Sequence, residues 1–264
     1  MQGDLDKMIV VAGYGYVGKA FYETFKDLEH CEIVDPKHTK NKITDFDATH
    51  VVVAVSTPEA KDGSCDMSNV IDVVKQCKPE TYIMIKSTIS MEGWQKLRAD
   101  FPDHRLTFSP EFLRAKTATQ DFQATDHIYL AGQWSHSWIP LLKKRFPGAQ
   151  YSIRKTPEEL IAGKYFRNAF LATKVSFFNQ VYDMCEKMGL NFKQVHEVIT
   201  DDKRIGRDHS NVTPERGFGG HCLPKDCEAI TKTADLADVD LSIIKEVLSY
   251  NKMLQKCNED VTED

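Results

Sequence analysis

Residues 10–21 read VVAGYGYVGKAF, and this stretch decides the fold. An apolar run ends at Gly13, and glycines recur at positions 15 and 18 as a helical pattern begins. The G-x-G-x-x-G spacing alone is not specific, but a position between a strand and a helix is typical of dinucleotide binding. Gly13 would make the tight turn, Gly15 would let the backbone approach a pyrophosphate, and Gly18 would let the helix pack on the strand. A glycine-rich turn without a ligand is the alternative.

The cofactor predicted from this stretch is NAD. Asp35 ends the next strand-like run, close to the offset of roughly 20 residues expected of a carboxylate that binds the ribose. An acid there favours NAD because it repels the 2′-phosphate of NADP. The segments 55–58 (VSTP) and 86–88 (KST) also end strands, where ligands of open α/β sheets bind, although such residues equally suit ordinary turns. The predicted cofactor-binding residues here are Gly13, Tyr14, Gly15, Tyr16, Val17, Gly18, Asp35, Thr57 and Thr88.

The first 155 residues alternate strand-like and helix-like patterns. Runs rich in Val and Ile predict parallel strands buried on both faces. Amphipathic stretches lie between these runs, so we expect an α/β fold: a Rossmann-like, doubly wound, mostly parallel sheet that forms an NAD-binding domain over residues 1–155. The predicted strands are residues 8–13, 31–35, 50–56, 82–87, 105–109, 127–132 and 150–153.

From residue 156 onward the pattern is helical, and no strand signal returns. Thr156 suits an N-cap, Pro157 the first helical position, and Glu159 completes a capping box. Apolar residues then recur at helical spacing as far as Gly189, which suits a C-terminal stop. A helix of about 32 residues usually links two parts of a protein or forms the core of a dimer. We therefore expect an all-helical central or dimerisation domain over residues 156–264.

Composition excludes several classes of protein. The formal net charge of −5 argues against a nucleic-acid binder, which normally has a basic face. No apolar run approaches the roughly 18–20 residues that span a bilayer, and the acidic N-terminus is not a signal peptide. Seven cysteines without a pairing pattern indicate free thiols in a reducing cytosol. We expect a cytoplasmic protein with no metal site, because Cys222 and Cys227 lack a second pair of zinc ligands.

Two stretches of the helical half carry candidate catalytic groups. Lys164 and Asn168 are four residues apart, so they share one helix face with apolar neighbours; spacing alone favours a solvated edge over a site. Residues 217–226 read GFGGHCLPKD and put the thiol of Cys222 on a glycine-rich turn, four residues before Asp226. Such a turn can bring backbone N–H groups close to a thiolate. A structural thiol beside a turn explains the same residues, and both interpretations stay open here.

The order of these motifs resembles one family. The glycine fingerprint is followed by SPEFLR (109–114), KYFRNAFLATKVSFFN (164–179), DDKRIG (201–206) and GFGGHCLPKD (217–226). Together they are similar to the UDP-glucose/GDP-mannose dehydrogenase family of nucleotide-sugar dehydrogenases, across essentially the whole chain. The last segment is highly specific, and PEF favours UDP-glucose or a close analogue as substrate. The resemblance implies that two NAD⁺ oxidise a sugar C6 alcohol to a carboxylate.

The resemblance also implies roles for individual residues. Cys222 would trap the intermediate aldehyde as a thiohemiacetal, which is then oxidised to a thioester. Lys164 would stabilise the developing oxyanion, with Asn168 as a further donor. Asp226 would work with Lys164 and a water held by Thr88 in proton removal.

Further residues would bind ligands or assist hydrolysis. Glu111 would assist thioester hydrolysis, and Lys225 would reach the NAD side. Arg204 would contact the substrate in a neighbouring subunit, which implies a homodimer through the long helix. The substrate-binding set that the resemblance implies is Glu111, Phe112, Leu113, Lys164, Asn168, Arg204, Gly217, Phe218 and Gly219.

Three departures from the family pattern matter. Ala115 stands where a second glutamate is common, which affects NAD contacts or hydrolysis. His221 precedes the cysteine where a small residue is usual, and an imidazolium there could favour the thiolate. Family members also continue through another α/β domain that supplies part of both binding sites, whereas this chain ends at Asp264.

Two other functions stay open. A helix with Lys-x-x-x-Asn is shared with two-electron hydroxyacid dehydrogenases of the 6-phosphogluconate and 3-hydroxyisobutyrate type, which need no cysteine. The second alternative is a non-catalytic protein that binds NAD or regulates a full-length partner through the long helix. The joint presence of Lys164, Asn168, Cys222 and Asp226 argues against the second, because a binding module does not need the full set.

Overall fold

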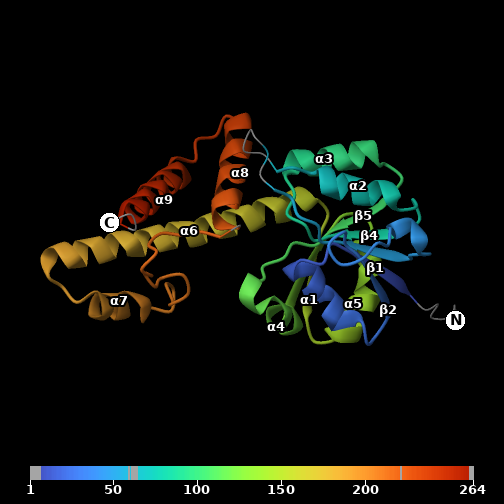
Figure 1. Ribbon diagram of the computed structural model, residues 1–264, viewed down its shortest axis with the longest axis horizontal. Coiled ribbons are helices and arrows are strands. Elements are labelled where there is room, and N and C mark those ends of the chain that lie inside the picture. Colours follow the sequence, from blue (N-terminus) through green and yellow to red (C-terminus); the bar gives the residue numbers. More distant parts are fainter. Residues whose placement is uncertain (1–6, 59, 61–64, 221, 262–264) are drawn as a thin grey trace. The chain divides into compact units, whose positions relative to one another are not determined.

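The computed structural model describes residues 7–58, 60, 65–220 and 222–261. The chain divides into two compact units, Met1–Lys164 and Tyr165–Asp264. Each unit is built on a different kind of secondary structure, the first on a sheet and the second on helices (Figure 1).

The first unit is organised around a seven-stranded sheet of order β2-β1-β3-β4-β5-β6-β7. All neighbouring strands are parallel except β5 and β6, which touch antiparallel at Phe108 and Ala131. Each predicted strand is present, so the mostly parallel, doubly wound sheet is confirmed. The strands are β1 (Met8–Ala12), β2 (His30–Val34), β3 (His50–Val53), β4 (Tyr82–Ile85), β5 (Arg105–Phe108), β6 (His127–Ala131) and β7 (Gln150–Arg154).

Helices cover both faces of this sheet. In Figure 1, α2 and α3 lie on one face, and α1, α4 and α5 lie on the other. The helices are α1 (Tyr16–Phe25), α2 (Ser68–Gln76), α3 (Met91–Asp100), α4 (Ala118–Gln123) and α5 (Ile139–Arg145), with short 3₁₀ turns η1 (Ile43–Asp45), η2 (Ala115–Thr117) and η3 (Ser135–Trp138). With both faces covered, β1 and β3 are buried on both sides, which explains their continuous apolar sequences.

The core beneath α1 is aromatic. Phe21 and Phe25 are fully buried one helical turn apart, and their rings stack with centroids 4.6 Å apart. Phe122 of α4 and Phe146 pack against them. This packing fixes α1 on the sheet, and with it the loop between β1 and α1.

The second unit is helical. Its elements are α6 (Pro157–Met188), which begins in the first unit, α7 (Phe192–Thr200), α8 (Leu223–Leu236) and α9 (Ser242–Val261). The predicted long helix is confirmed, with Pro157 as its first residue and 32 residues in all. Gly189 ends it with φ +67°, where its N–H bonds the carbonyl of Glu186 and the N–H of Leu190 bonds that of Cys185. These two bonds satisfy carbonyls that a helix end would otherwise leave unpaired.

In the part of the chain that the structure describes, no helix is both long enough and apolar enough to cross a membrane.

Candidate functional site

The loop between β1 and α1 needs glycine at two positions for reasons internal to the fold. Gly13 has φ +91°, and a Cβ there would lie 2.6 Å from the carbonyl oxygen of Ala54. A Cβ on Gly18 would lie 1.9 Å from the carbonyl oxygen of Gly13. Glycine is therefore required for the turn at the first position and for close packing of α1 at the second.

Gly15 is different, because the fold itself does not require it. Its φ is −71°, and no heavy atom lies within 4 Å of where a Cβ would be. It is the N-cap of α1, where no side chain caps the helix and no acidic residue occupies the first turn. The space beside Gly15 at the start of α1 is therefore open. This arrangement suits an anionic group that approaches the backbone closely.

Asp35 is held beside the same loop. One carboxylate oxygen accepts a hydrogen bond of 2.7 Å from the N–H of Tyr14, and the other accepts one of 2.8 Å from the N–H of Lys37. β1 lies between β2 and β3, so the strand order reverses at the loop, where open α/β sheets bind ligands. The buried Thr57 follows β3 at the same edge of the sheet.

Lys164, the last residue of the first unit, is buried. Only 8% of it is exposed, and its ammonium donates a 2.6 Å hydrogen bond to the hydroxyl of Thr88, just beyond β4. The solvated-edge interpretation of Lys164 is therefore wrong, because the side chain is buried and bonds to Thr88. This contact holds the Lys164 amino group in a defined position at a strand end, where a cation would suit a developing oxyanion.

Glu111 forms a buried ion pair that sequence reasoning missed. Its partner is Lys86, and the two side chains are 9% and 5% exposed. The Lys86 ammonium also lies 3.3 Å from the hydroxyl of Ser109 and 5.4 Å from the centre of the Phe122 ring. The pair keeps Glu111 in a defined position at the end of β5.

In the second unit, Asp226 is nearly inaccessible, with 1% of its surface exposed. Asn168 donates a 2.6 Å hydrogen bond to its Oδ2, and the Lys225 ammonium lies 3.2 Å from its Oδ1. No described residue hydrogen-bonds to Oδ1. The carboxylate is thus held between the Asn168 amide on Oδ2 and the Lys225 ammonium beside Oδ1.

Cys222 lies one helical turn before Asp226. It is the N-cap of α8, and its carbonyl accepts a 2.9 Å hydrogen bond from the N–H of Asp226. Cys222 is exposed, whereas its neighbour Cys227 is buried, and burial raises the pKa of the Cys227 thiol to about 12. A helix N-terminus favours negative charge, so Cys222 has the position expected of a reactive thiol.

The remaining predicted residues have simpler surroundings. Arg204 is highly exposed and pairs with Asp202 at 2.5 Å, so it faces solvent. Phe112 and Leu113 are half-buried, and Gly219 is exposed. Ala115 begins η2 and is exposed. His221 lies outside the described residues.

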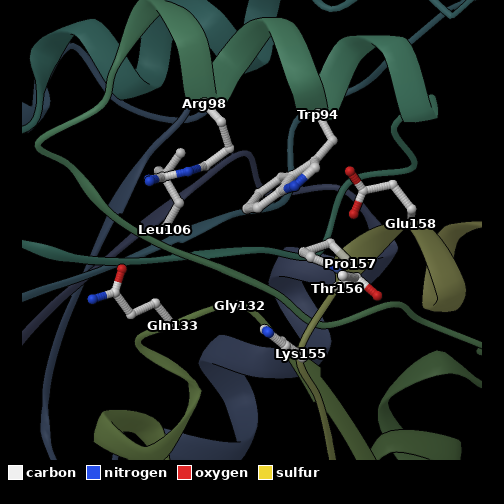
Figure 2. A pocket seen from close by; sticks show the side chains of 9 residues that line it. All are labelled: Trp94, Arg98, Leu106, Gly132, Gln133, Lys155, Thr156, Pro157 and Glu158. Atoms are coloured by element: carbon white, nitrogen blue, oxygen red, sulfur yellow. The ribbon is translucent and has the colours of Figure 1, made fainter.

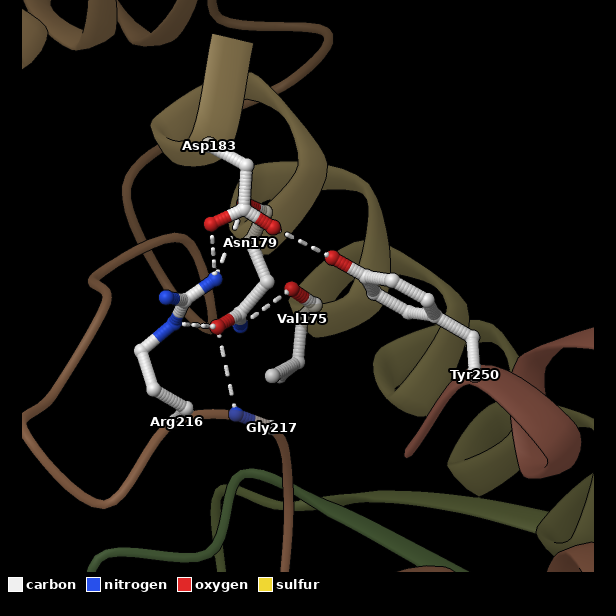
Figure 3. Close-up of polar contacts among 6 residues, drawn as sticks. All are labelled: Val175, Asn179, Asp183, Arg216, Gly217 and Tyr250. Atoms are coloured by element: carbon white, nitrogen blue, oxygen red, sulfur yellow. Dashed lines mark hydrogen bonds and ion pairs between the residues drawn. The ribbon is translucent and has the colours of Figure 1, made fainter. Parts of the chain in front are cut away.

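A cluster of polar residues between α6 and the glycine-rich loop was also missed. Figure 3 shows Arg216 and Gly217 facing Asn179 and Asp183, with Tyr250 on the other side of Asp183. No signal in the local sequence indicated this cluster, because Asn179 lies among both polar and apolar residues.

A pocket of about 260 Å³ lies elsewhere in the first unit. In Figure 2, Trp94 and Arg98 of α3 face the first residues of α6 across it. None of the predicted site residues lines it, so it is separate from the groups above. Its lining is Trp94, Arg98, Leu106, Gly132, Gln133, Lys155, Thr156, Pro157 and Glu158.

Comparison with known proteins agrees with the motifs. Residues 26–146 match the NAD binding domain of the UDP-glucose/GDP-mannose dehydrogenase family, and residues 159–253 match its central domain. UDP-glucose 6-dehydrogenase of Rickettsia prowazekii is 34% identical over 226 residues, which make up 81% of this chain and 51% of that protein. The chain thus spans about half the length of the curated relatives it matches.

Solved structures agree as well. A UDP-glucose dehydrogenase from the archaeon Pyrobaculum islandicum superposes with a TM-score of 0.81 at 25% identity, over 96% of this chain and 69% of that one. A 3-hydroxyisobutyrate dehydrogenase of Mycobacterium tuberculosis gives 0.71 at 17% identity over 94% of both chains, a likeness of fold alone. The chain belongs to the UDP-glucose/GDP-mannose dehydrogenase family, of which it contains the NAD-binding and central domains.

Proposed function

We propose that this chain carries the cofactor site and the catalytic residues of an NAD-dependent dehydrogenase that oxidises the C6 alcohol of a nucleotide sugar, UDP-glucose, to the carboxylate. The observation that carries the proposal is the group formed by Asn168, Cys222 and Asp226. An exposed thiol is the N-cap of α8, and one turn later a buried carboxylate accepts a hydrogen bond from Asn168 and pairs with Lys225. A protein that only bound NAD would need neither.

The first unit fits NAD. The open space at Gly15 and the uncapped start of α1 suit the diphosphate, and Asp35 suits the hydroxyls of a ribose. When bound, NAD⁺ accepts a hydride from the C6 carbon in each of two oxidations. Thr57 and Lys225 are further cofactor contacts that we propose.

The first oxidation needs a base and a positive charge. We assign proton removal from the C6 hydroxyl to Asp226, whose Oδ1 accepts no hydrogen bond from a described residue and lies 3.2 Å from the Lys225 ammonium. Lys164, held by the Thr88 hydroxyl, stabilises the negative charge that develops on the C6 oxygen. Asn168 keeps the Asp226 carboxylate in place through its 2.6 Å hydrogen bond.

The second oxidation needs the thiol. An aldehyde carbon carries no hydroxyl group. It therefore cannot lose a hydride from carbon together with a proton from oxygen, as the alcohol did. The Cys222 sulfur bonds to the aldehyde carbon and the oxygen takes up a proton, which restores that group as a thiohemiacetal. Loss of a hydride and a proton gives a thioester. Glu111 then accepts a proton from the attacking water, the C–S bond breaks, and the carboxylate and free thiol result.

We also propose a homodimer through α6. Large apolar side chains on this helix are exposed at spacings of four and seven residues, which puts them on one face. Such a continuous exposed face is typical of a protein interface. Its members are Phe166, Phe170, Phe177, Met184 and Met188.

The test is the ratio of NADH formed to UDP-glucose consumed by the full chain. We expect about two for the wild type and no more than one for Cys222→Ser, because the hydroxyl is a weaker nucleophile. Cys77→Ser is the matched control, since Cys77 is buried and bonds the carbonyl of Val73, which a serine hydroxyl can also do. Failure of the wild type to turn over any nucleotide sugar would overturn the proposal. One NADH per sugar, insensitive to Cys222→Ser, would instead identify a two-electron dehydrogenase.

A further inference from the structure

Residues 216–218, just before the glycines that lead to Cys222, are held by two buried asparagines. Asn179 of α6 is 1% exposed, and its Oδ1 accepts hydrogen bonds from the Arg216 guanidinium at 2.8 Å and from the N–H of Gly217 at 3.2 Å (Figure 3). Its amide nitrogen donates to the carbonyl of Val175 at 2.9 Å. Every polar atom of this side chain is therefore used, and its orientation is fixed.

Asn251 of α9 holds the next residue at both of its backbone groups. Its Oδ1 accepts from the N–H of Phe218 at 2.7 Å, and its Nδ2 donates to the Phe218 carbonyl at 2.9 Å. Gln255 adds a second donor to that carbonyl at 3.0 Å. A Cβ on Gly217 would lie 2.4 Å from the Asn251 Oδ1, so the amide approaches this closely only because residue 217 is glycine.

Arg216 adds an ion pair that supports an unfavourable backbone conformation. Its φ of +49° lies in the left-handed region, which costs a residue with a Cβ roughly 1 kcal/mol or more. Its guanidinium pairs with Asp183 at 2.5 Å and lies over the Tyr182 ring at 4.8 Å. The other Asp183 oxygen accepts a 3.0 Å hydrogen bond from Tyr250 of α9. Residues of α6 and α9 thus hold residues 216–218 together, and we call this set of contacts the clamp.

The clamp ends where the flexible part of the loop begins. Gly219 and Gly220 follow Phe218, and both are exposed, with Gly220 at φ +75°. Glycine gives a chain the greatest conformational freedom, so the contacts on either side of these two residues matter for where the following thiol lies. α8, which starts directly after Cys222, holds the loop from the other end.

We propose that Asn179, Arg216 and Asn251 are positioning residues that hold the Cys222 thiol ready to capture the aldehyde, an inference that rests on the proposed function. Capture competes with escape of the aldehyde into solvent. A displacement of about 1 Å can slow an oriented reaction by about 100-fold. Release of the loop therefore lets aldehyde leave after one oxidation, whereas a general loss of stability reduces both oxidations together and leaves their ratio unchanged.

The experiment measures NADH formed per UDP-glucose consumed, with hydroxylamine present to trap free aldehyde for mass spectrometry. We expect the ratio to fall from about two toward one in Asn251→Ala and Arg216→Ala, with trapped aldehyde as the missing product. Arg216→Lys keeps the charge opposite Asp183 and should recover part of the ratio. Ser249→Ala, an exposed change on the same helix, is the control and should keep a ratio of two.

A ratio of two in both alanine variants would overturn the proposal, as would an equal fall in Ser249→Ala. Hydrogen exchange without substrate gives a second reading that does not need turnover. Amides of residues 216–220 should exchange at least tenfold faster in Asn251→Ala, whereas those of α7 should not change. Equal exchange in wild type and variant would also overturn the clamp. If the wild type forms no NADH at all, the proposed function is refuted. The hydrogen-exchange measurement then tests by itself whether these residues hold the loop.

Discussion

Replacing Lys86 with methionine should destabilise the first unit strongly and in a pH-dependent way. Lys86 follows β4 directly, its side chain is 5% exposed, and its partner Glu111 is 9% exposed. Methionine has a similar length but no charge. The substitution thus leaves a carboxylate without its cation in a place from which water is excluded.

The expected loss of unfolding free energy follows from the cost of protonating the Glu111 carboxylate. A buried, unpaired carboxylate takes up a proton rather than remain charged. Protonating a glutamic acid with the reference pKa of about 4.3 at pH 7 costs about 3.7 kcal/mol, since each pH unit is worth about 1.4 kcal/mol. Loss of the cation over the Phe122 ring, 5.4 Å away, adds about 0.5–1 kcal/mol, which burial of the methionine offsets. We expect a loss of about 3–4 kcal/mol at pH 7.

The sign of the pH dependence can be worked out. In the variant, the folded state holds one more proton than the unfolded state at pH values above about 4.3, so its stability falls with rising pH by about 1.4 kcal/mol per unit. The deficit relative to wild type should therefore shrink to about 1 kcal/mol at pH 5. Other titrating groups are common to both proteins and cancel in this difference.

Urea unfolding followed by tryptophan fluorescence measures this free energy for the right unit, because all 3 tryptophans (Trp94, Trp134 and Trp138) lie in Met1–Lys164. Lys86→Met combined with Glu111→Gln should recover most of the loss, since no charge is then buried. Lys78→Met, which breaks an exposed pair with Asp47, is the control and should change little. A deficit below about 1 kcal/mol at pH 7, or one that is equal at pH 5 and pH 7, would refute the reasoning.

Two further predictions concern the same unit. Gly15→Ala should weaken NAD binding at least tenfold in calorimetry without changing the urea midpoint, whereas Gly18→Ala should lower the midpoint because its Cβ would lie 1.9 Å from a carbonyl oxygen; a lowered midpoint in Gly15→Ala would contradict this. Burial lowers the pKa of His50 to about 4, so the stability that neutral His50 contributes is present above about pH 6.5 and lost as pH falls towards 4. Unfolding measured between pH 4 and 7 should show a shallower acid decline in His50→Phe, and an unchanged decline would contradict it.

The sequence predicted the elements of the fold well because strands that are buried on both faces consist mainly of apolar residues. β1, β3 and β4 are buried on both faces, and their Val and Ile runs are correspondingly continuous. The antiparallel contact of β5 with β6 could not be predicted, because the burial pattern of a strand is the same in either direction. β3 also ends at Val53 rather than at the predicted residue 56, since the chain leaves the sheet at the edge where β1 turns towards α1.

Groups that depend on register were harder to predict than groups that depend on local spacing. Lys86 and Glu111 are 25 positions apart in the sequence, and the local sequence around either residue does not predict the other as its partner. Their meeting follows from the pairing of Ile85 with Phe108 across β4 and β5, which brings the residues just beyond these strands together. A lysine directly after a buried strand was the available signal, because such a charge needs a partner.

The same distinction explains why candidate catalytic residues could be predicted from the sequence, whereas the residues proposed to position them could not. The proposed nucleophile, base and phosphate-binding turn depend on particular residue types at short spacing, and Cys222, Asp226 and Gly15 lie in such local motifs. A residue that positions them only has to reach a backbone group, and Asn251 reaches the N–H and carbonyl of Phe218 from 33 residues away. Its sequence neighbourhood looks like that of an ordinary amphipathic helix. Buried amides that bond both groups of one loop residue are therefore the feature to seek in a structure when a motif supplies a nucleophile on a glycine-rich turn.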